Sequence, residues 1–150
     1  MSLMPTSVSV LSCIETELIH GCTISSIISI SVAEESPQVL FVLQKNSLIG
    51  SKIKTLKFFS INVLSKFQVS SAQKYSTKRL PDLASDSDWS VKERFASLNT
   101  SLVVFHCEFL TLHETNFSEI FVANVIETFA NARQTPLIYH ARKYHELDIP

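Results

Sequence analysis

Two long stretches in the second half of the chain alternate apolar and polar residues, and this period restricts the possible folds more than any other sequence feature. Every second side chain of residues 102–113 would share one face of an extended strand, and these are Val103, Phe105, Cys107 and Phe109. Residues 120–129 alternate in the same way, and the polar segment 115–118 between them predicts a hairpin. A strand as long as 102–113 also needs a bulge or a bend. We therefore expect an antiparallel sheet to organise the fold.

The first third of the chain predicts a hairpin and two further strands. Residues 8–14 alternate, and the polar residues 15–17 turn the chain back toward Gly21. In the segment 28–32 isoleucine and valine alternate with serine, so we expect a strand with one buried face. After a proline, the apolar run 39–43 predicts a fully buried strand.

Two short helices and a surface excursion are predicted between the strands. The first helix should begin after Ser47, with Asn46 or Ser47 as its N-cap. Its apolar face has the spacing i, i+4 and i+7 and consists of Ile49, Ile53 and Leu56. Residues 65–74 suit a second, modest helix because glutamine, lysine and alanine tolerate that conformation. The polar residues 76–90 predict a surface excursion anchored by Trp89.

The chain is expected to form one mainly β domain over residues 1–150. Residues 59–64 add a half-buried strand, and a final strand with a short continuation contains Leu137, Tyr139 and Leu147. About six strands with two or so short helices predict a small Greek-key β-barrel. The sequence has only 2 glycines, far below the usual content of about 7%. We therefore expect the turns to rely on asparagine, aspartate, serine and proline.

Charge and cysteine content exclude several classes of partner. Thirteen basic and fourteen acidic side chains nearly cancel, and no basic block marks a nucleic acid or membrane surface. No apolar run approaches the roughly 20 residues that a bilayer requires. The three cysteines, Cys13, Cys22 and Cys107, lack CxxC spacing and indicate reduced thiols. These features favour a soluble cytoplasmic protein.

Hydroxyl and amide side chains on two successive segments predict a phosphate site. The first segment carries Thr23, Ser25 and Ser26, and the second carries Gln44, Lys45, Asn46 and Ser47. A helix N-terminus after Ser47 would add orphan N–H donors, and its dipole and the lysine charge favour a phosphate dianion. Taken alone, the first hydroxyls are more typical of an exposed edge strand, and Lys45 of a solvated loop. The joint pattern favours the site.

Five short elements follow one another along the chain. They are Gly21-x-Thr23-x-Ser25-Ser26, Pro37 before an apolar strand, Lys45-Asn46-Ser47, Phe59–Leu64, and Pro136–His140 followed by Tyr144. In order and spacing they resemble the short-chain flavin reductase family, whose members are FMN-binding split β-barrels. The likeness spans most of the chain and implies a small Greek-key split β-barrel.

The resemblance also implies a cofactor, a co-substrate and partners. It implies FMN, or FAD, as the flavin, NADH or NADPH as the co-substrate, and a homodimer with each flavin site at the interface. A separate monooxygenase is the implied acceptor of reduced flavin. Asn62, on the second face of its strand, is expected to close the flavin site, and His140 approaches the flavin by resemblance only. The predicted flavin-binding residues are Thr23, Ser25, Ser26, Gln44, Lys45, Asn46, Ser47, Asn62 and His140.

The chain departs from the family pattern at two places. Where the family carries Gly-Asp-His in a hairpin, this chain has Asn116-Phe117-Ser118, so the histidine that helps to seat the nicotinamide is missing. A threonine that commonly follows the Ser47-type serine by two positions is Ile49 here. The resemblance therefore implies a largely complete flavin cradle beside an altered nicotinamide contact.

Other kinds of chemistry find weaker support in the sequence. His113 and Glu114 form a single pair, which is too few ligands for a metal site. His20, His106, His140 and His145 are scattered, and a lone histidine on a strand is more often a packed or surface residue than a catalyst. The lack of a Gly-x-Ser-x-Gly elbow, a Walker loop or a Rossmann glycine set weakens hydrolase, P-loop and dinucleotide-fold interpretations.

Three functions stay open on the sequence alone. The first is an NAD(P)H-dependent flavin reductase in which the cofactor carries the chemistry and the protein supplies binding and orientation. The second is a flavin-binding split-barrel protein with little reductase activity, which acts as a carrier, sensor or interaction partner. The third is a small β-barrel interaction module without a cofactor. Bleaching of bound flavin by NADH or NADPH would separate the first from the second.

Overall fold

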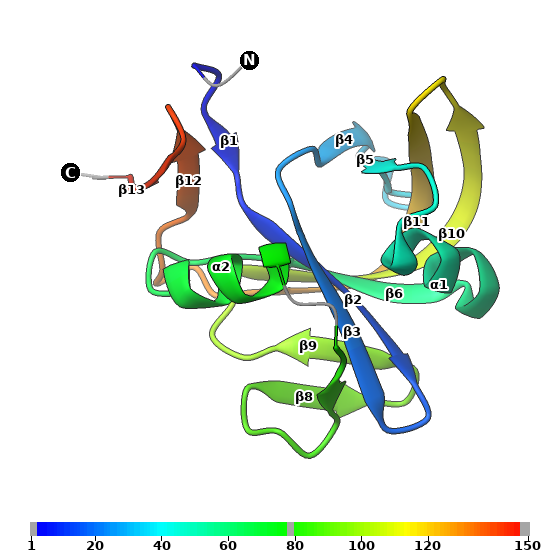
Figure 1. Ribbon diagram of the computed structural model, residues 1–150, viewed down its shortest axis with the longest axis horizontal. Coiled ribbons are helices and arrows are strands. Elements are labelled where there is room, and N and C mark those ends of the chain that lie inside the picture. Colours follow the sequence, from blue (N-terminus) through cyan, green and yellow to red (C-terminus); the bar gives the residue numbers. More distant parts are fainter. Residues whose placement is uncertain (1–2, 78–79, 148–150) are drawn as a thin grey trace.

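An eight-stranded antiparallel sheet forms most of the molecule in the computed structural model, which describes residues 3–77 and 80–147. Its strand order is β4 (Ile28–Ser31), β5 (Gln38–Gln44), β11 (Ser118–Ala130), β10 (Val103–Glu114), β6 (Phe58–Val63), β2 (Ser9–Glu15), β3 (Leu18–Ile24) and β7 (Asp82–Leu83). The sheet is strongly twisted, so that the long β10–β11 hairpin rises away from β2 and β3 (Figure 1). The predicted mainly β fold and the 115–118 hairpin are confirmed.

Smaller elements pack around this sheet. A three-stranded sheet is made of β1 (Thr6–Ser7), β12 (Leu137–His140) and β13 (Lys143–Glu146). A separate hairpin is made of β8 (Trp89–Lys92) and β9 (Phe95–Leu98), and the sequence analysis missed it. Helix α1 (Leu48–Leu56) lies near the base of the β10–β11 hairpin, whereas α2 (Val69–Thr77) lies on the other side of β2 and β3 (Figure 1).

Two apolar clusters hold these layers together. One joins α1 to β5, β6 and β11, and at its centre the ring of Phe41 stacks on that of Phe121 with centroids 5.2 Å apart. The other joins α2 to β2, β9 and β12, and it includes Leu64, Tyr75 and Trp89. Each helix thus buries one apolar face against a different part of the sheet.

The structure confirms some local predictions and corrects others. Ser47 is the N-cap of α1, because its hydroxyl oxygen accepts a hydrogen bond from the Gly50 N–H at 3.2 Å. Trp89 is buried and anchors the surface excursion, of which residues 78 and 79 lie outside the described residues. The second helix begins at Val69, four residues later than predicted for 65–74, because the Gln68 side chain accepts from the Ser65 N–H and occupies the preceding turn.

The predicted buried face of segment 28–32 is wrong. Ile28, Ile30 and Val32 are 59%, 49% and 86% exposed, because β4 is an edge strand that pairs only with β5. In β5 itself Val39, Phe41 and Leu43 are buried while the residues between them are half-buried, so this strand is less enclosed than predicted. An exposed apolar edge strand is a surface on which another chain packs readily.

Turn conformations differ from the composition-based prediction. Seven described residues other than glycine have positive φ: Thr16, Asn46, Lys57, Glu93, Thr100, Ala141 and Arg142. Only Asn46 belongs to the residue types expected for turns, and neither glycine has positive φ. The chain therefore holds its tight turns in a left-handed conformation that costs side-chain-bearing residues about 1–2 kcal/mol each.

No helix in the described part of the chain has the length and apolar character needed to cross a bilayer. Of the three thiols, those of Cys13 and Cys107 are buried and that of Cys22 is half-buried. Cys13, Cys22 and Cys107 are free cysteines. Burial raises the pKa of Cys13 to about 12 and also raises the pKa values of Cys22 and Cys107. All three therefore stay protonated near neutral pH, and burial also shields Cys13 and Cys107 from reagents.

Candidate functional site

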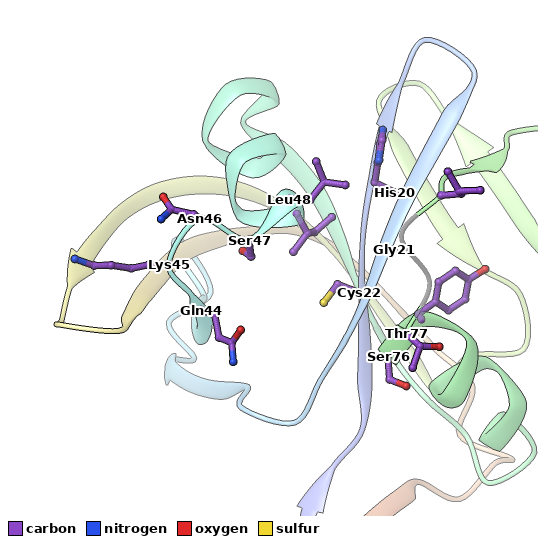
Figure 2. A pocket seen from close by; sticks show the side chains of 13 residues that line it. His20, Gly21, Cys22, Gln44, Lys45, Asn46, Ser47, Leu48, Ser76 and Thr77 are labelled. Carbon is purple, nitrogen blue, oxygen red and sulfur yellow. The ribbon is translucent and has the colours of Figure 1, made fainter.

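A cavity of about 670 Å³ opens between β3, the turn from β5 into α1, and the end of α2. Its lining consists of His20, Gly21, Cys22, Gln44, Lys45, Asn46, Ser47, Leu48, Ile49, Tyr75, Ser76, Thr77 and Leu80. Figure 2 shows β3 as one wall, with the turn and α1 facing it across the opening. Segments that are distant in sequence thus bring the predicted Gln44–Ser47 turn into a single concave site.

Gly21 lets the wall of the cavity come close to α2. A Cβ atom at this position would lie 2.7 Å from Cδ1 of Tyr75, a distance that the aromatic ring does not tolerate without moving. The Tyr75 hydroxyl donates to Asp82 Oδ2 at 2.5 Å, and burial together with this bond raises the pKa of Tyr75. Tyr75 is therefore held rigidly, and the glycine is required by packing rather than by its backbone angle.

The turn between β5 and α1 supplies the polar wall. Asn46 takes the left-handed conformation at φ 60°, which asparagine tolerates better than most residues. This bend places Ser47 at the N-cap and leaves the first turn of α1, with Leu48 and Ile49, on the cavity wall. The first N–H groups of a helix have no partners within the helix and carry the positive end of its dipole. The turn is therefore built to receive an anion or a strong acceptor.

Lys45 has a partner outside the cavity. Its Nζ lies 3.1 Å from Oε2 of Glu114 on β10, and the side chain points away from β3 (Figure 2). Its backbone N–H donates to the Phe117 carbonyl at 3.1 Å, so the cavity turn is tied to the β10–β11 hairpin. Because the two charged side chains are 34% and 60% exposed, their pairing is weak, worth about 0–1 kcal/mol. An anionic ligand can therefore displace Glu114 from Lys45 at a small cost in free energy.

His20 lines the cavity, and the sequence analysis left it among the scattered histidines. Its Nε2 atom is buried without a hydrogen-bond partner, 3.9 Å from a Glu15 carboxylate oxygen. Burial lowers the pKa of His20, the nearby Lys52 ammonium lowers it further, and Glu15 acts in the opposite direction. The imidazole is therefore neutral at pH 7. No local pattern marks His20, because the cavity forms only where β3 faces the β5–α1 turn and the end of α2.

The chemistry of this cavity is that of a binding site. No carboxylate occurs among its lining residues, all of which belong to the described part of the chain. Its polar groups are amides, hydroxyls, helix N–H groups and Lys45, which suit a phosphate and a polar heterocycle. The hydrogen bonds of its hydroxyls are local, since Ser47 accepts from the Gly50 N–H and both Ser76 and Thr77 donate to the Gln73 carbonyl.

The first group of predicted hydroxyls lies outside the cavity lining. The Thr23 hydroxyl donates to the Ala72 carbonyl at 2.7 Å and fastens α2 to β3. The Ser26 hydroxyl accepts from the Val42 N–H and lies 3.1 Å from the carbonyl oxygen of the same residue, which extends the β4–β5 edge. Ser25 is exposed at the bend after β3. The fold thus uses Thr23 and Ser26 for its own hydrogen bonds.

Asn62 and His140 are also placed away from the cavity. Asn62 is fully buried, its Nδ2 donates to Val10 O and Ser12 Oγ at 2.9 Å, and its Oδ1 accepts from Leu98 N–H at 2.8 Å. The amide of Asn62 therefore serves contacts among β2, β6 and β9, and Asn62 is not among the residues that line the cavity. His140 lies on β12 in the three-stranded sheet, beside His145, and this chain does not bring it to the cavity.

Comparisons with known proteins give a family and a fold. The family described as "Flavin reductase like domain" matches residues 1–148. No protein with a curated description matches the chain in sequence. Among solved structures, the NADH:FAD oxidoreductase SgcE6 of Streptomyces globisporus C-1027 is similar with a TM-score of 0.89 and 20% identity, over 99% of this chain and 89% of that chain.

Two further structures show the same fold. BorF, the flavin reductase component of a bacterial two-component tryptophan halogenase, has a TM-score of 0.89 and 20% identity, over 99% of this chain and 94% of that chain. The styrene monooxygenase flavin reductase SMOB of Pseudomonas putida S12 has a TM-score of 0.83 and 23% identity, over 99% of this chain and 95% of that chain. The backbone likeness extends over nearly the whole chain.

Proposed function

The chain belongs to the flavin reductase-like domain family, and we propose that it is a flavin reductase in which NADH or NADPH reduces FMN for a monooxygenase or another acceptor. The observation that carries this proposal is the cavity between β3 and the β5–α1 turn, which joins a helix N-terminus to amide and hydroxyl groups. Similar structures include an NADH:FAD oxidoreductase, alone and in complex with NAD and FAD fragments, which supports flavin and nicotinamide as ligands. FAD is the alternative flavin.

The residues of the turn fit the phosphate of FMN. The N–H groups at the start of α1 and the side chains of Asn46 and Ser47 offer donors, while Lys45 offers a full positive charge. Gln44 and the neutral His20 supply polar atoms deeper along β3 and β5. Bound flavin supplies the hydride chemistry, so this chain has to bind, orient and exclude water, and no general acid is required of it.

The altered hairpin lies next to this turn. Phe117 is 83% exposed, while its carbonyl accepts from the Lys45 N–H, so residues 116–118 border the cavity turn without filling it. The resemblance places an imidazole at Ser118 to seat the nicotinamide. We therefore expect slow reduction with free nicotinamide, although flavin affinity is retained, and losing one orienting contact costs about a factor of ten for each 1.4 kcal/mol.

A lysine replacement with a matched control tests the binding site. Lys45→Ala should weaken FMN binding by about 1 to 2 kcal/mol, since a bond to a charged group is worth about 1.5–3 kcal/mol and an exposed ion pair is lost in exchange. Lys66→Ala is the control, because Lys66 and Glu146 form a similarly exposed pair, 32% and 58%, outside the cavity. Equal FMN affinities of the two variants would indicate that the flavin binds elsewhere on the molecule.

Two further measurements test the site and the reaction separately. Bound FMN should protect Cys22, which lines the cavity, from alkylation at mildly alkaline pH, while Cys13 and Cys107 stay buried with or without FMN. Anaerobic mixing of the FMN complex with NADH should then bleach the flavin without another protein. Protection without bleaching would identify a flavin-binding protein with little reductase activity, and absence of both would remove the flavin proposal.

The exposed edge strand supports a homodimer. Ile28 and Ile30 on β4 and the adjacent Val32 are exposed apolar side chains, and symmetric pairing is the commonest way to cover such a surface. Sedimentation at micromolar concentration should show a dimer. Ile30→Lys should shift the protein toward monomer, and a monomeric unaltered chain would contradict the proposal.

A further inference from the structure

A second cavity of about 380 Å³ lies between the β8–β9 hairpin and the ends of β10 and β11 that are remote from the 115–118 hairpin. Ser97 and His106 both line it. The Ser97 hydroxyl oxygen is 2.9 Å from His106 Nε2, and His106 Nδ1 is 3.3 Å from Oε2 of Glu127. A hydroxyl, an imidazole and a carboxylate are therefore linked in series, the order that activates a serine as a nucleophile.

The imidazole in this series is held by packing on both sides. His106 is 1% exposed, and its ring stacks on Phe95 with centroids 4.2 Å apart and planes 3° apart. Phe129 meets the same ring edge-on at 5.1 Å. Glu127 is the direct cross-strand partner of His106, and the Lys92 ammonium lies 3.1 Å from its carboxylate. Such support keeps a base in one orientation before a substrate arrives.

The protonation state suits a general base. Burial lowers the pKa of His106, and Lys92 also lowers it, while the bond to Glu127 acts in the opposite direction, so the imidazole is neutral at pH 7. The Glu127 carboxylate only accepts, so Nδ1 carries the proton and donates to it. Nε2 is then an acceptor, and the Ser97 hydroxyl donates to it. Among the described residues, Glu127 and Lys92 are the charged groups that act on His106.

We propose that Ser97 is a nucleophile that hydrolyses small carboxylic esters, with His106 as general base and Glu127 as a positioning residue. Ser97 Oγ attacks the carbonyl carbon as its proton passes to His106 Nε2. The ester C–O bond breaks, and the leaving alcohol takes that proton. Water then attacks the acyl group on Ser97, gives its proton to His106, and releases the acid as Ser97 Oγ is reprotonated. The reaction requires only ester and water, so this activity is independent of the flavin proposal.

The cavity wall indicates the class of ester. Leu98, Val104 and Phe129 give it an apolar part, and Asn131 adds an amide of the kind that stabilises an oxyanion. At about 380 Å³ it suits a short or medium acyl chain. Its lining contains Lys92 as a cation and no carboxylate among the residues that the structure describes there, so a neutral or acidic ester is favoured.

A fluorophosphonate probe and p-nitrophenyl acetate test the proposal on the full chain. The probe should label the protein on Ser97, as located by peptide mass spectrometry, and Ser97→Ala should lose both labelling and acetate hydrolysis. His106→Gln should slow both by at least about 100-fold, the lower range for loss of a general base. Ser70→Ala is the matched control, because Ser70 is exposed on α2 and lies outside the lining of this cavity. Its rates should equal those of the unaltered chain.

Glu127→Gln separates positioning from mere structural support. Because Glu127 raises the pKa of His106, this variant should lower the maximal labelling rate and move the inflection of its pH profile to lower pH. A purely structural role would lower the rate without moving the inflection. Unfolding midpoints identify any variant that is not folded. Labelling of the unaltered chain no faster than that of Ser97→Ala, or labelling at another residue, would overturn the proposal.

Discussion

The two cavities differ in which part of the chain holds their polar groups. Around the first, donors come from a turn and a helix N-terminus, and Gln44 and Asn46 are exposed. Around the second, Ser97, His106 and Glu127 lie on three neighbouring strands, and the imidazole is fixed between aromatic rings. A site for a cofactor that brings its own chemistry needs suitable donors, whereas a site that relies on protein groups needs them already aligned.

Asn62, on a central strand of the sheet, supports the second cavity. It lies on β6, between β2 and β10. Its Oδ1 accepts a hydrogen bond from the N–H of Leu98, and Leu98 is the residue next to Ser97. The second cavity therefore depends on a buried amide, whereas the first depends on close contact between Gly21 and Tyr75. The predictions below disturb one cavity at a time.

Asn62→Ala should have the largest effect. Its loss leaves the Val10 carbonyl, the Ser12 hydroxyl and the Leu98 N–H short of a buried partner, and an unsatisfied group costs about 1–3 kcal/mol, so we expect a loss of about 3 kcal/mol or more. Chemical denaturation measures it. The FMN affinity of the folded variant should stay unchanged while labelling of Ser97 falls. Asn124→Ala is a control, because its amide bonds only to the partly buried Gln38 side chain among the described contacts. Loss of FMN affinity in the folded variant, with labelling of Ser97 unchanged, would instead assign Asn62 to the flavin site.

Gly21→Ala should disturb the first cavity and leave the second unchanged. The new methyl group would meet the Tyr75 ring at 2.7 Å, and overpacking of this kind costs about 1–3 kcal/mol. Because Tyr75 is fixed by Asp82, the strain should distort the first cavity and weaken FMN binding. Labelling of Ser97 should not change. Unaltered stability together with unaltered FMN affinity would show that the ring moves aside freely.

Acidification should disturb both cavities through their histidines. The folded-state pKa values of His20 and His106 lie below the ordinary value of 6.5, so the unfolded chain binds protons first as the pH falls. The free energy of unfolding should therefore decrease from pH 7 to pH 5. Glu15 and Glu127 do not contribute to this decrease, because their pKa values are lowered and they take up protons only at more acidic pH. Denaturation of His20→Gln and His106→Gln at both pH values should each show a smaller decrease. Equal slopes would indicate that neither imidazole is responsible.

Two turn residues should give the smallest and most contrasting effects. Thr100 borders the second cavity with φ 64°, and Thr100→Gly should stabilise the chain by about 0.5–1 kcal/mol, because relief of left-handed strain exceeds the added chain entropy. Asn46→Gly should change stability by only a few tenths of a kcal/mol, because asparagine tolerates this conformation. Thermal unfolding of both variants measures the contrast. A destabilised Thr100→Gly would show that its side chain contributes more than its backbone costs.

Local patterns in the sequence were sufficient for some features of the molecule. The Ser47 cap depends on residues three positions away, and the β10–β11 hairpin on two alternating runs around a short turn, so both could be predicted. The Thr23 hydroxyl donates to the Ala72 carbonyl 49 residues along the chain, a contact that no local pattern predicts. The same limit applies to Ser97, His106 and Glu127. Pairing of β10 with β11 sets Glu127 opposite His106, and packing of the β8–β9 hairpin brings Ser97 to the same imidazole. The exposed face of β4 reflects its edge position, which alternation alone does not reveal.

Strand register between β10 and β11 has an evolutionary consequence. His106 is paired with Glu127, whereas the next residue, Cys107, is paired with Val125, so Ile126 is an extra residue in β11. The bulge bends the barrel and, in the same step, sets which side chains lie opposite one another beyond it. Insertions in surface turns leave this arrangement alone, but gain or loss of one residue within β11 would change the barrel curvature and the His106–Glu127 pairing together. Descendants of this chain can therefore vary the length of their loops far more freely than the length of β11.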